Sequence, residues 1–303
     1  MRKIQSLVLA GLFVVVYAAT CLGIDKEAGT SGAVFLKIGG DARLKAMGSA
    51  GSALSGGAGL VLSNPASIAN LSKKEAALTY LSYFQGISLG QLGYAQDFGF
   101  GNLGANITYL SHDDIRGYDD SGNYKGDYSA NNLALVFSYA REVKDFALGA
   151  NLKYVKEEIE QEDAACLGLD LGGIYKTKYK DLHISSVVQN LGGKVRLKKE
   201  GDPLPLNFKL GTSYKYLLKN RPLSLVLDIN FPRDNKINYS LGTEYLINKV
   251  LAIRAGYCLL KDSEAEGLTC GIGFRFKELS LDYAWQPFGD LGDAHWFSFK
   301  IKM

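Results

Sequence analysis

Apolar and polar residues alternate along most of this chain, and this alternation constrains the fold more than any other feature. One stretch alternates Leu223, Leu225, Leu227, Ile229 and Phe231 with Ser224, Val226, Asp228 and Asn230, and residues 206–216 and 237–245 repeat the pattern. Successive side chains of a strand point to opposite faces, so each stretch predicts a strand with one apolar and one polar side. Repeated along a chain, the pattern is typical of a barrel with lipid outside and water or a polar plug inside.

About fourteen such stretches follow Glu75, and bacterial single-chain barrels have even strand numbers. The predicted strands are 75–85, 87–97, 102–111, 130–141, 145–158, 164–176, 181–190, 205–217, 222–231, 236–247, 250–260, 267–276, 279–285 and 294–303. Segments of roughly ten residues suit a tilted crossing of the bilayer. The sequence therefore predicts an all-β, transmembrane antiparallel barrel over residues 75–303.

The links between these strands alternate in length. Short links lie near 99–101, 142–144, 177–180, 218–221, 248–249 and 277–278, and longer ones near 112–129, 192–204 and 286–293. Outer-membrane barrels have short periplasmic turns and longer external loops, so the alternation also predicts the orientation of the barrel.

Residues 1–23 have the features of a secretory signal peptide. Arg2 and Lys3 precede an apolar run from Leu7 to Tyr17, and small residues follow to Gly23. This run is too short to span a bilayer, and no run of about 18 apolar residues follows it, so we expect no transmembrane helix. Export together with the strand pattern predicts the bacterial outer membrane.

Residues 24–74 differ from the rest in being dense in Gly, Ala and Ser. Asp41 is a candidate cap for a short helix towards Leu54, although glycines weaken this helix. A flexible linker is the alternative, but a linker does not need the apolar anchors that this segment contains. We predict that it forms a hatch, or plug, in the barrel lumen, with Phe35, Met47, Asn64, Pro65 and Ala66 as its candidate site residues.

Charged residues occupy the inward positions of the later strands: Lys209, Asp228, Glu244, Arg254, Arg275 and Asp282. Opposite charges on adjacent strands pair across a lumen of low effective dielectric. We interpret this lumen charge ladder as structural in preference to a specific substrate site. Inward glycines on neighbouring strands leave room for an insert.

One strand pattern is irregular. Near Gln91 the alternation slips, because Leu89 and Leu92 fall on opposite faces, and Gly90 and Gly93 lie beside them. This predicts a bulge or kink in the second strand, which in a barrel wall is a candidate opening.

Several function classes are excluded. The 34 Lys+Arg against 31 Asp+Glu give a formal charge of +3, which offers no basic excess for nucleic acid. His183 and Ser185 share a strand face, but no nucleophile motif accompanies them, so we do not expect an enzyme. The cysteines have no metal-ligand spacing, and Cys258 and Cys270 point to opposite faces, so no metal, cofactor or disulfide is expected.

A family resemblance rests on two parts of the chain. Ala28-Gly29-Thr30-Ser31, Phe35 to Arg43, Ala46 to Ala50 and Asn64-Pro65-Ala66 resemble the start of PorV/PorQ-type outer-membrane proteins, and 291–299 resemble the family's last strand. That family is similar to the FadL-like long-chain fatty acid transporters. The resemblance implies a fourteen-stranded barrel plugged by an N-terminal hatch. The chain departs from it where 55–59 replace an acidic stretch and where Met303 replaces a final aromatic residue.

The resemblance implies two functions, and a purely structural surface protein is the third possibility. A FadL-like protein is a passive conduit for hydrophobic or amphipathic molecules, and requires an apolar pocket between residues 35–71 and the wall. A PorV-like protein is a secretion-system component that binds exported proteins at the cell surface. The implied partners are outer-membrane lipid, a hydrophobic ligand, and a secreted protein or secretion-system component. The modest loops favour the conduit.

Overall fold

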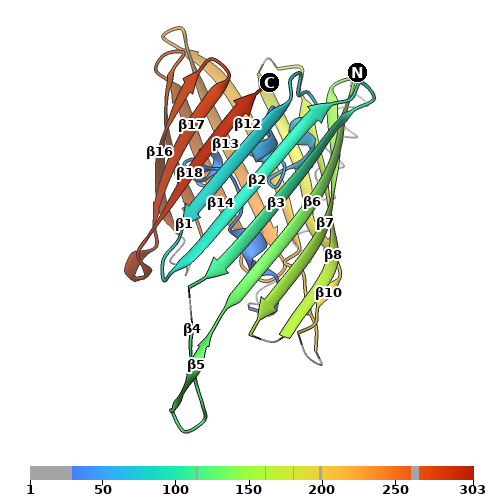
Figure 1. Ribbon diagram of the computed structural model, residues 1–303. Helices are drawn as coiled ribbons and strands as arrows, with labels where there is room; N and C mark the ends of the chain where they lie inside the picture. Colours follow the sequence, from blue (N-terminus) through green and yellow to red (C-terminus); the bar gives the residue numbers. More distant parts are fainter. Residues whose placement is uncertain (1–28, 114, 161, 180, 198–199, 261–265) are drawn as a thin grey trace.

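Fourteen antiparallel strands close into a barrel in the computed structural model, which describes residues 29–113, 115–160, 162–179, 181–197, 200–260 and 266–303 (Figure 1). The strands are β1 (Glu75–Ser82), β2 (Ile87–Asp97), β3 (Asn102–His112), β6 (Ala130–Val143), β7 (Phe146–Ile159), β8 (Glu162–Lys176), β9 (Leu182–Gly192), β12 (Asn207–Leu218), β13 (Arg221–Pro232), β14 (Asn238–Leu246), β15 (Leu251–Leu259), β16 (Gly267–Phe276), β17 (Leu279–Pro287) and β18 (Asp293–Lys302). β1 pairs with both β2 and β18, which closes the ring. The predicted all-β barrel is confirmed, whereas the predicted signal peptide lies outside the described residues.

The alternation in the sequence becomes the two sides of the wall. On β13, Ser224, Val226 and Asp228 are buried towards the lumen, while Leu225 between them is 46% exposed on the outer surface. The outer surface is apolar on other strands too, at Leu92, Phe137, Leu152, Ile253 and Phe297. Such a surface is stable against lipid chains and not against water, as expected of a membrane barrel.

The two ends of the barrel differ. The turns at one end are short, and β18 ends there at the C-terminus. Several links at the other end are longer, and they contain β4 (Ile115–Tyr118), β5 (Tyr124–Tyr128), β10 (Lys194–Val195), β11 (Asp202–Pro203) and the 3-10 helix η4 (Gly289–Leu291). β4 and β5 pair as a hairpin that extends beyond the barrel (Figure 1). The observed asymmetry follows the predicted pattern of links.

The predicted irregularity in the second strand is wrong. β2 pairs without a register shift from Ile87 to Asp97 with β3, and Leu89 points inward while Leu92 points outward. The register shift lies instead between β8 and β9, at Leu169/Leu171. The polar stretch around Gln91 retains its alternation because inward Gln91 is accommodated in the polar lumen, where it accepts a hydrogen bond from the backbone of Gly40.

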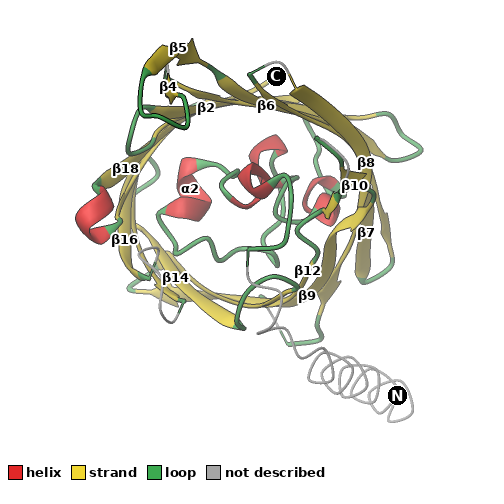
Figure 2. Cartoon of the chain, turned by 90° about the horizontal axis from the view of Figure 1, so that it is seen from below, coloured by secondary structure: helices red, strands yellow, loops and turns green. Residues whose placement is uncertain are grey.

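Residues 29–74, which we call the inner segment, lie inside the ring of strands (Figure 2). They form short helices: η1 (Val34–Lys37), α2 (Ala42–Lys45), η2 (Ala58–Leu60) and η3 (Pro65–Ile68). Asp41 caps α2, as predicted, by accepting a hydrogen bond from the backbone of Leu44. The helix ends after one turn because Gly48, three residues on, adopts a φ of +66°. No helix among the described residues is long and apolar enough to cross a membrane.

Candidate functional site

The backbone of the inner segment lies directly against the barrel wall, at wall glycines. A Cβ atom on Gly256 would lie 2.1 Å from the backbone nitrogen of Gly48, and one on Gly149 would lie 2.5 Å from the carbonyl carbon of Pro65. The backbone of Met47 comes equally close to Gly242, and the side chains of Asn64, Ser52 and Ala46 come equally close to Gly172, Gly211 and Gly271, respectively. Any side chain at these positions would displace the inner segment, so the glycines determine how closely it docks.

The five candidate hatch residues are all buried in the inner segment. Phe35 and Met47 pack in two separate apolar clusters. Asn64 accepts a hydrogen bond from the backbone of Ala66 at 2.9 Å and donates one to the carbonyl of Ser52 at 2.7 Å. Pro65 occupies the first turn of η3, where its missing N–H costs nothing. The contacts show how these residues fold the segment, and their role in a hatch stays a prediction.

Four of the six candidate ladder residues come together with the inner segment in an ion-pair layer. The layer consists of Asp41, Arg43, Glu244, Arg254, Arg275, Asp282 and Lys300. Glu244, 3% exposed, accepts hydrogen bonds from Arg43 at 2.8 and 2.9 Å and from Arg254 at 2.7 Å. Arg275 approaches the same carboxylate at 3.4 Å. Each buried charge therefore faces an opposite one, which the low dielectric of the lumen requires.

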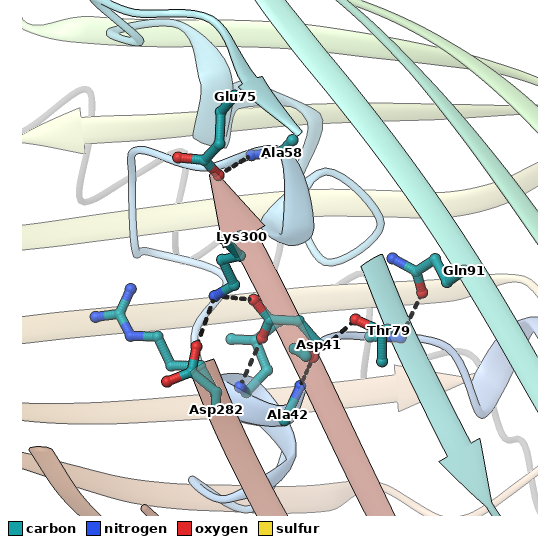
Figure 3. Close-up of polar contacts among 12 residues, drawn as sticks. Asp41, Ala42, Ala58, Glu75, Thr79, Gln91, Asp282 and Lys300 are labelled. Atoms are coloured by element: carbon teal, nitrogen blue, oxygen red, sulfur yellow. Dashed lines mark hydrogen bonds and ion pairs between the residues drawn. The ribbon is translucent and has the colours of Figure 1, made fainter. Parts of the chain in front are cut away.

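Lys300 extends this layer to the last strand (Figure 3). Its Nζ lies 2.7 Å from Oδ2 of Asp41 and 3.2 Å from Oδ2 of Asp282. Beside it, the backbone N–H of Ala42 donates to the hydroxyl of Ser298 at 2.8 Å. An ion pair and a hydrogen bond thus connect the start of α2 to β18, and Lys300 also pairs with Asp282 of β17.

The other two ladder residues do not pair with each other. Asp228 accepts hydrogen bonds from the backbones of Gly51 and Ser52, at 3.0 Å each, and from the Ser52 hydroxyl at 2.7 Å. Lys209, on the neighbouring strand, lines a cavity instead.

Sequence reasoning missed Asp41, Arg43 and Lys300 as members of the charged network. Lys300 has the inward parity of its strand, which is a usable signal. Asp41 and Arg43 lie outside any strand, and nothing in a single sequence pairs Arg43 with Glu244 or Asp41 with Lys300, more than two hundred positions away.

A cavity of about 350 Å³ lies between the inner segment and the wall. Its lining includes Tyr83, which directly follows β1, and Asn207 and Asn238, the first residues of β12 and β14, so it occupies the half of the lumen nearer the long links. The predicted pocket was apolar, and the observed one is mixed. Phe35, Leu36, Ile38, Leu44, Phe288 and Trp296 contribute apolar surface, whereas asparagines, glutamines and four lysines contribute polar groups.

The opposite half of the lumen is filled. Val61, Ile68 and Leu71 of the inner segment pack against the wall alanines Ala77 and Ala95. The ion-pair layer occupies the neighbouring part of the same half. Packed apolar groups and paired charges of this kind exclude water from the space that they occupy.

The β8–β9 register shift lies beside the cavity. Two residues of β9, Gln189 and Asn190, stand opposite the single residue Asp170 of β8. Asn190 has a φ of +60°, and its N–H donates to Asp170 Oδ1 at 2.8 Å in place of a backbone carbonyl. Lys153 lies 2.8 Å from the same oxygen. The strand-to-strand ladder is therefore interrupted by side chains where the cavity touches the wall.

For metal binding, nucleophilic catalysis and disulfide formation, the described part of the chain has no matching geometry. No group of three metal-ligating side chains occurs there. Ser185 lies 2.8 Å from the hydroxyl of Ser52, within the contacts that hold the inner segment. Cys258 lines the cavity and Cys270 is exposed, so the two lie on opposite faces of the wall.

The fold is similar to that of a solved toluene transporter and of a solved FadL homologue. The Pseudomonas putida toluene transporter TodX has a TM-score of 0.60 at 14% identity, over 87% of this chain and 97% of TodX. A Pseudomonas aeruginosa FadL homologue has a TM-score of 0.57 at 12% identity, over 87% of this chain and 98% of the homologue. At such identities the likeness concerns the fold alone. No curated protein sequence matches the chain.

The family is shown by the sequence itself. The family model described as Type IX secretion system protein PorV matches residues 23–232, which is more than half of the chain. The match covers the inner segment, whose resemblance to PorV proteins was drawn from residues 28–70, and the wall from β1 to β13. The chain therefore belongs to the PorV family of outer-membrane β-barrel proteins.

Proposed function

We propose that this protein is a passive conduit for hydrophobic or amphipathic small molecules. The cavity between the inner segment and the wall carries the proposal, because it offers apolar and polar surface in the half of the lumen nearer the long loops. Cavities of this size with a few polar groups among apolar ones are typical of small-molecule sites. The inner segment, as the predicted hatch of residues 24–74, would form the floor of this site.

The route onward from the cavity leads sideways. Straight passage is opposed by the ion-pair layer and by the apolar packing around Ile68. The β8–β9 register shift at Asp170 is the place where the wall beside the cavity is held by side chains instead of a continuous ladder. Passage between these two strands would release a hydrophobic molecule directly into the membrane.

Neighbouring residues of β14 provide the test. Ser240 is buried and lines the cavity, whereas Leu241 points outward and is 50% exposed. Ser240→Phe fills the cavity, and Leu241→Phe is the matched control on the lipid face. The probe is 1-anilinonaphthalene-8-sulfonate, an amphipathic dye that fluoresces in apolar surroundings.

We expect purified protein to bind the dye, and cells that produce it to take up the dye faster than cells that do not. Ser240→Phe should abolish both effects and Leu241→Phe neither. Absence of binding by the unaltered protein contradicts the proposal.

Membership in a protein secretion system is the second candidate, and the family match favours it. The β4–β5 hairpin supplies a surface for it, since it extends beyond the barrel at the long-loop end with Tyr118 and Tyr124 exposed. Deleting the gene should then retain exported proteins in the periplasm, and a variant lacking 115–128 should not restore their export. Unchanged export in the gene deletion contradicts this function.

The division into residues 1–23, 24–74 and 75–303 stays a prediction. N-terminal sequencing of the protein purified from outer membranes tests its first boundary. A mature chain that starts near residue 24 agrees with a cleaved signal peptide, and one that starts at Met1 does not.

A further inference from the structure

Positive charge collects in the cavity. Among the described residues its lining contains four lysines, Lys37, Lys45, Lys153 and Lys209, and no aspartate or glutamate. Two of these ammonium groups are neutralised from outside the lining, Lys37 by Asp234 and Lys153 by Asp170. The cavity therefore keeps the charge of the remaining two.

Lys45 and Lys209 have no ion pair within the described part of the chain, although each is less than one-tenth exposed. Lys45 lies over the ring of Trp296, with its Nζ 5.6 Å from the ring centre. The carboxylate nearest in sequence, Asp41, is itself paired with Lys300. Elsewhere in this lumen buried charges are compensated, as in the ion-pair layer, so these two buried and uncompensated lysines are an exception.

The pKa of Lys45 also reflects the lack of a compensating charge. Desolvation, and next the charge of Lys209, lower the pKa of Lys45 to about 8. Cys258 and Asp41 act in the opposite direction and do not compensate for these effects. The Lys45 ammonium is therefore destabilised by its burial and by the charge of Lys209, and a bound anion would relieve this destabilisation.

We propose that Lys45 and Lys209 form an anion site that holds the phosphate-type headgroup of an amphiphile, with its apolar part against Phe35, Leu36 and Phe288. Two ammonium groups require two negative charges, which a phosphate monoester carries and a carboxylate does not. The apolar part of the lining gives the tail a surface that free phosphate cannot use. The inference rests on the proposed function, and it specifies the class of molecule that enters the cavity.

Ligands with one tail and different charges provide the test. Octyl phosphate, octanoate and octanol carry about two, one and no negative charges at pH 7.5. Inorganic phosphate has the headgroup alone, and dihexanoyl phosphatidic acid has it on a two-chain lipid. The protein is kept in dodecyl maltoside, which carries neither charge nor phosphate. The fluorescence of Trp296, which lines the cavity, reports binding. It is measured in a Trp285→Phe background, because the chain contains two tryptophans and Trp285 lies on the outer face of β17.

Octyl phosphate should bind about tenfold more tightly than octanoate, and octanol should bind most weakly. Lys45→Gln and Lys209→Gln should each weaken octyl phosphate binding about tenfold, which corresponds to one lost charged contact. Neither substitution should change octanol binding. Lys215→Gln is the matched control, because Lys215 lies on the same strand and lumen side but is exposed near the other end of β12.

The two proposals fail differently. Equal affinities for octyl phosphate and octanol, or full affinity in Lys45→Gln and Lys209→Gln, overturn the anion site but leave the conduit in place. If none of the three octyl ligands binds and the naphthalene dye does not bind either, the proposed function fails as well. Tighter binding of inorganic phosphate than of octyl phosphate also overturns the inference, because the apolar part then contributes nothing. The tighter binder of octyl phosphate and the phosphatidic acid shows whether the phosphate headgroup belongs to a single-chain ester or to a two-chain lipid.

Discussion

At the scale of single residues, the wall glycines that contact the inner segment should tolerate substitution least. Gly256→Ala places a methyl group against the backbone of Met47 and Gly48, which has no rotamer with which to move aside. We expect a loss of about 1–3 kcal/mol in the free energy of unfolding, as for other overpacked interiors. Urea titration in micelles measures it. Gly90→Ala is the control, since its new Cβ would meet no atom within 4 Å, and equal effects of both substitutions would contradict close docking.

Glu244 is the residue on which the ion-pair layer depends. Glu244→Gln removes the carboxylate shared by Arg43, Arg254 and Arg275. Arg254 keeps its pair with Asp282, whereas the largely buried guanidinium of Arg43 loses its ion-pair partner. The expected loss of stability is about 3–5 kcal/mol, because an uncompensated buried charge remains. Urea titration should also show an unchanged midpoint for Glu278→Gln, whose pair with Lys73 is exposed. Similar midpoints for the two variants would mean that the layer adds nothing to stability.

The charge on Lys45 gives the anion site a pH dependence. Since its pKa is about 8, Lys45 is cationic below that pH and loses its charge as the pH rises through it. The phosphate monoester gains its second charge near pH 6, so octyl phosphate should bind most tightly between roughly pH 6 and 8. The charged or titratable groups that act on Lys45 are Lys209, Cys258 and Asp41. Titration from pH 6 to 9.5 should show affinity falling above pH 8, and Lys45→Arg should remove that fall.

At the scale of elements, the β4–β5 hairpin is separate from the barrel wall. β3 and β6, which flank it in sequence, pair directly with each other from Asn102↔Ala140 to Ser111↔Asn131. Replacing residues 115–128 with a short Gly-Ser link should therefore leave the barrel closed and dye binding intact. Electrophoresis of heated and unheated samples tests closure. Loss of the compact, fast-migrating form would mean that the hairpin contributes to the wall.

The sequence was most informative about strands and least informative about what lies inside them. Predicted strands 145–158 and 222–231 agree with β7 and β13 within a residue at each end, because the period of two extends over the whole segment. The β8–β9 register shift was not foreseen, since it depends on a side chain, Asp170, replacing a backbone acceptor. The inner segment has no period to read, and its contacts with Glu244, Asp228 and Lys300 are all long-range.

In the candidate site, too, the positions of strand residues could be predicted, and their contacts with the inner segment could not. The inward parity of Glu244, Arg254, Arg275 and Asp282 predicted that they share the lumen, and they meet in one layer. That Lys209 leaves the ladder for the cavity depends on the inner segment. In the inner segment, the backbone N–H groups of Gly51 and Ser52 donate hydrogen bonds to the Asp228 carboxylate. Lys209 is left without an ion-pair partner among the described residues. The cavity itself arises only when the segment and the wall are placed together.

At the scale of the whole molecule, the inner segment and the wall should behave as one rigid body. Backbone N–H groups of the segment donate to wall side chains at Ser298, Thr269, Asp228 and Glu75. These amides should exchange with deuterium as slowly as those of the wall strands, while amides of the β4–β5 hairpin exchange first. Hydrogen exchange followed by mass spectrometry measures the order. Fast exchange over residues 42–58 would instead indicate a segment that moves aside.

The ties between α2 and the last strand impose a sequence of events during biogenesis. Asp41 needs Lys300, and Ala42 needs Ser298, so residues made first by the ribosome obtain their partners from residues made last. β1 likewise waits for β18 to complete the ring. The beginning of the chain must therefore be kept unaggregated until the end has been inserted, and then enclosed as the seam closes. A variant that binds no ligand can thus have lost an assembly step instead of a binding contact.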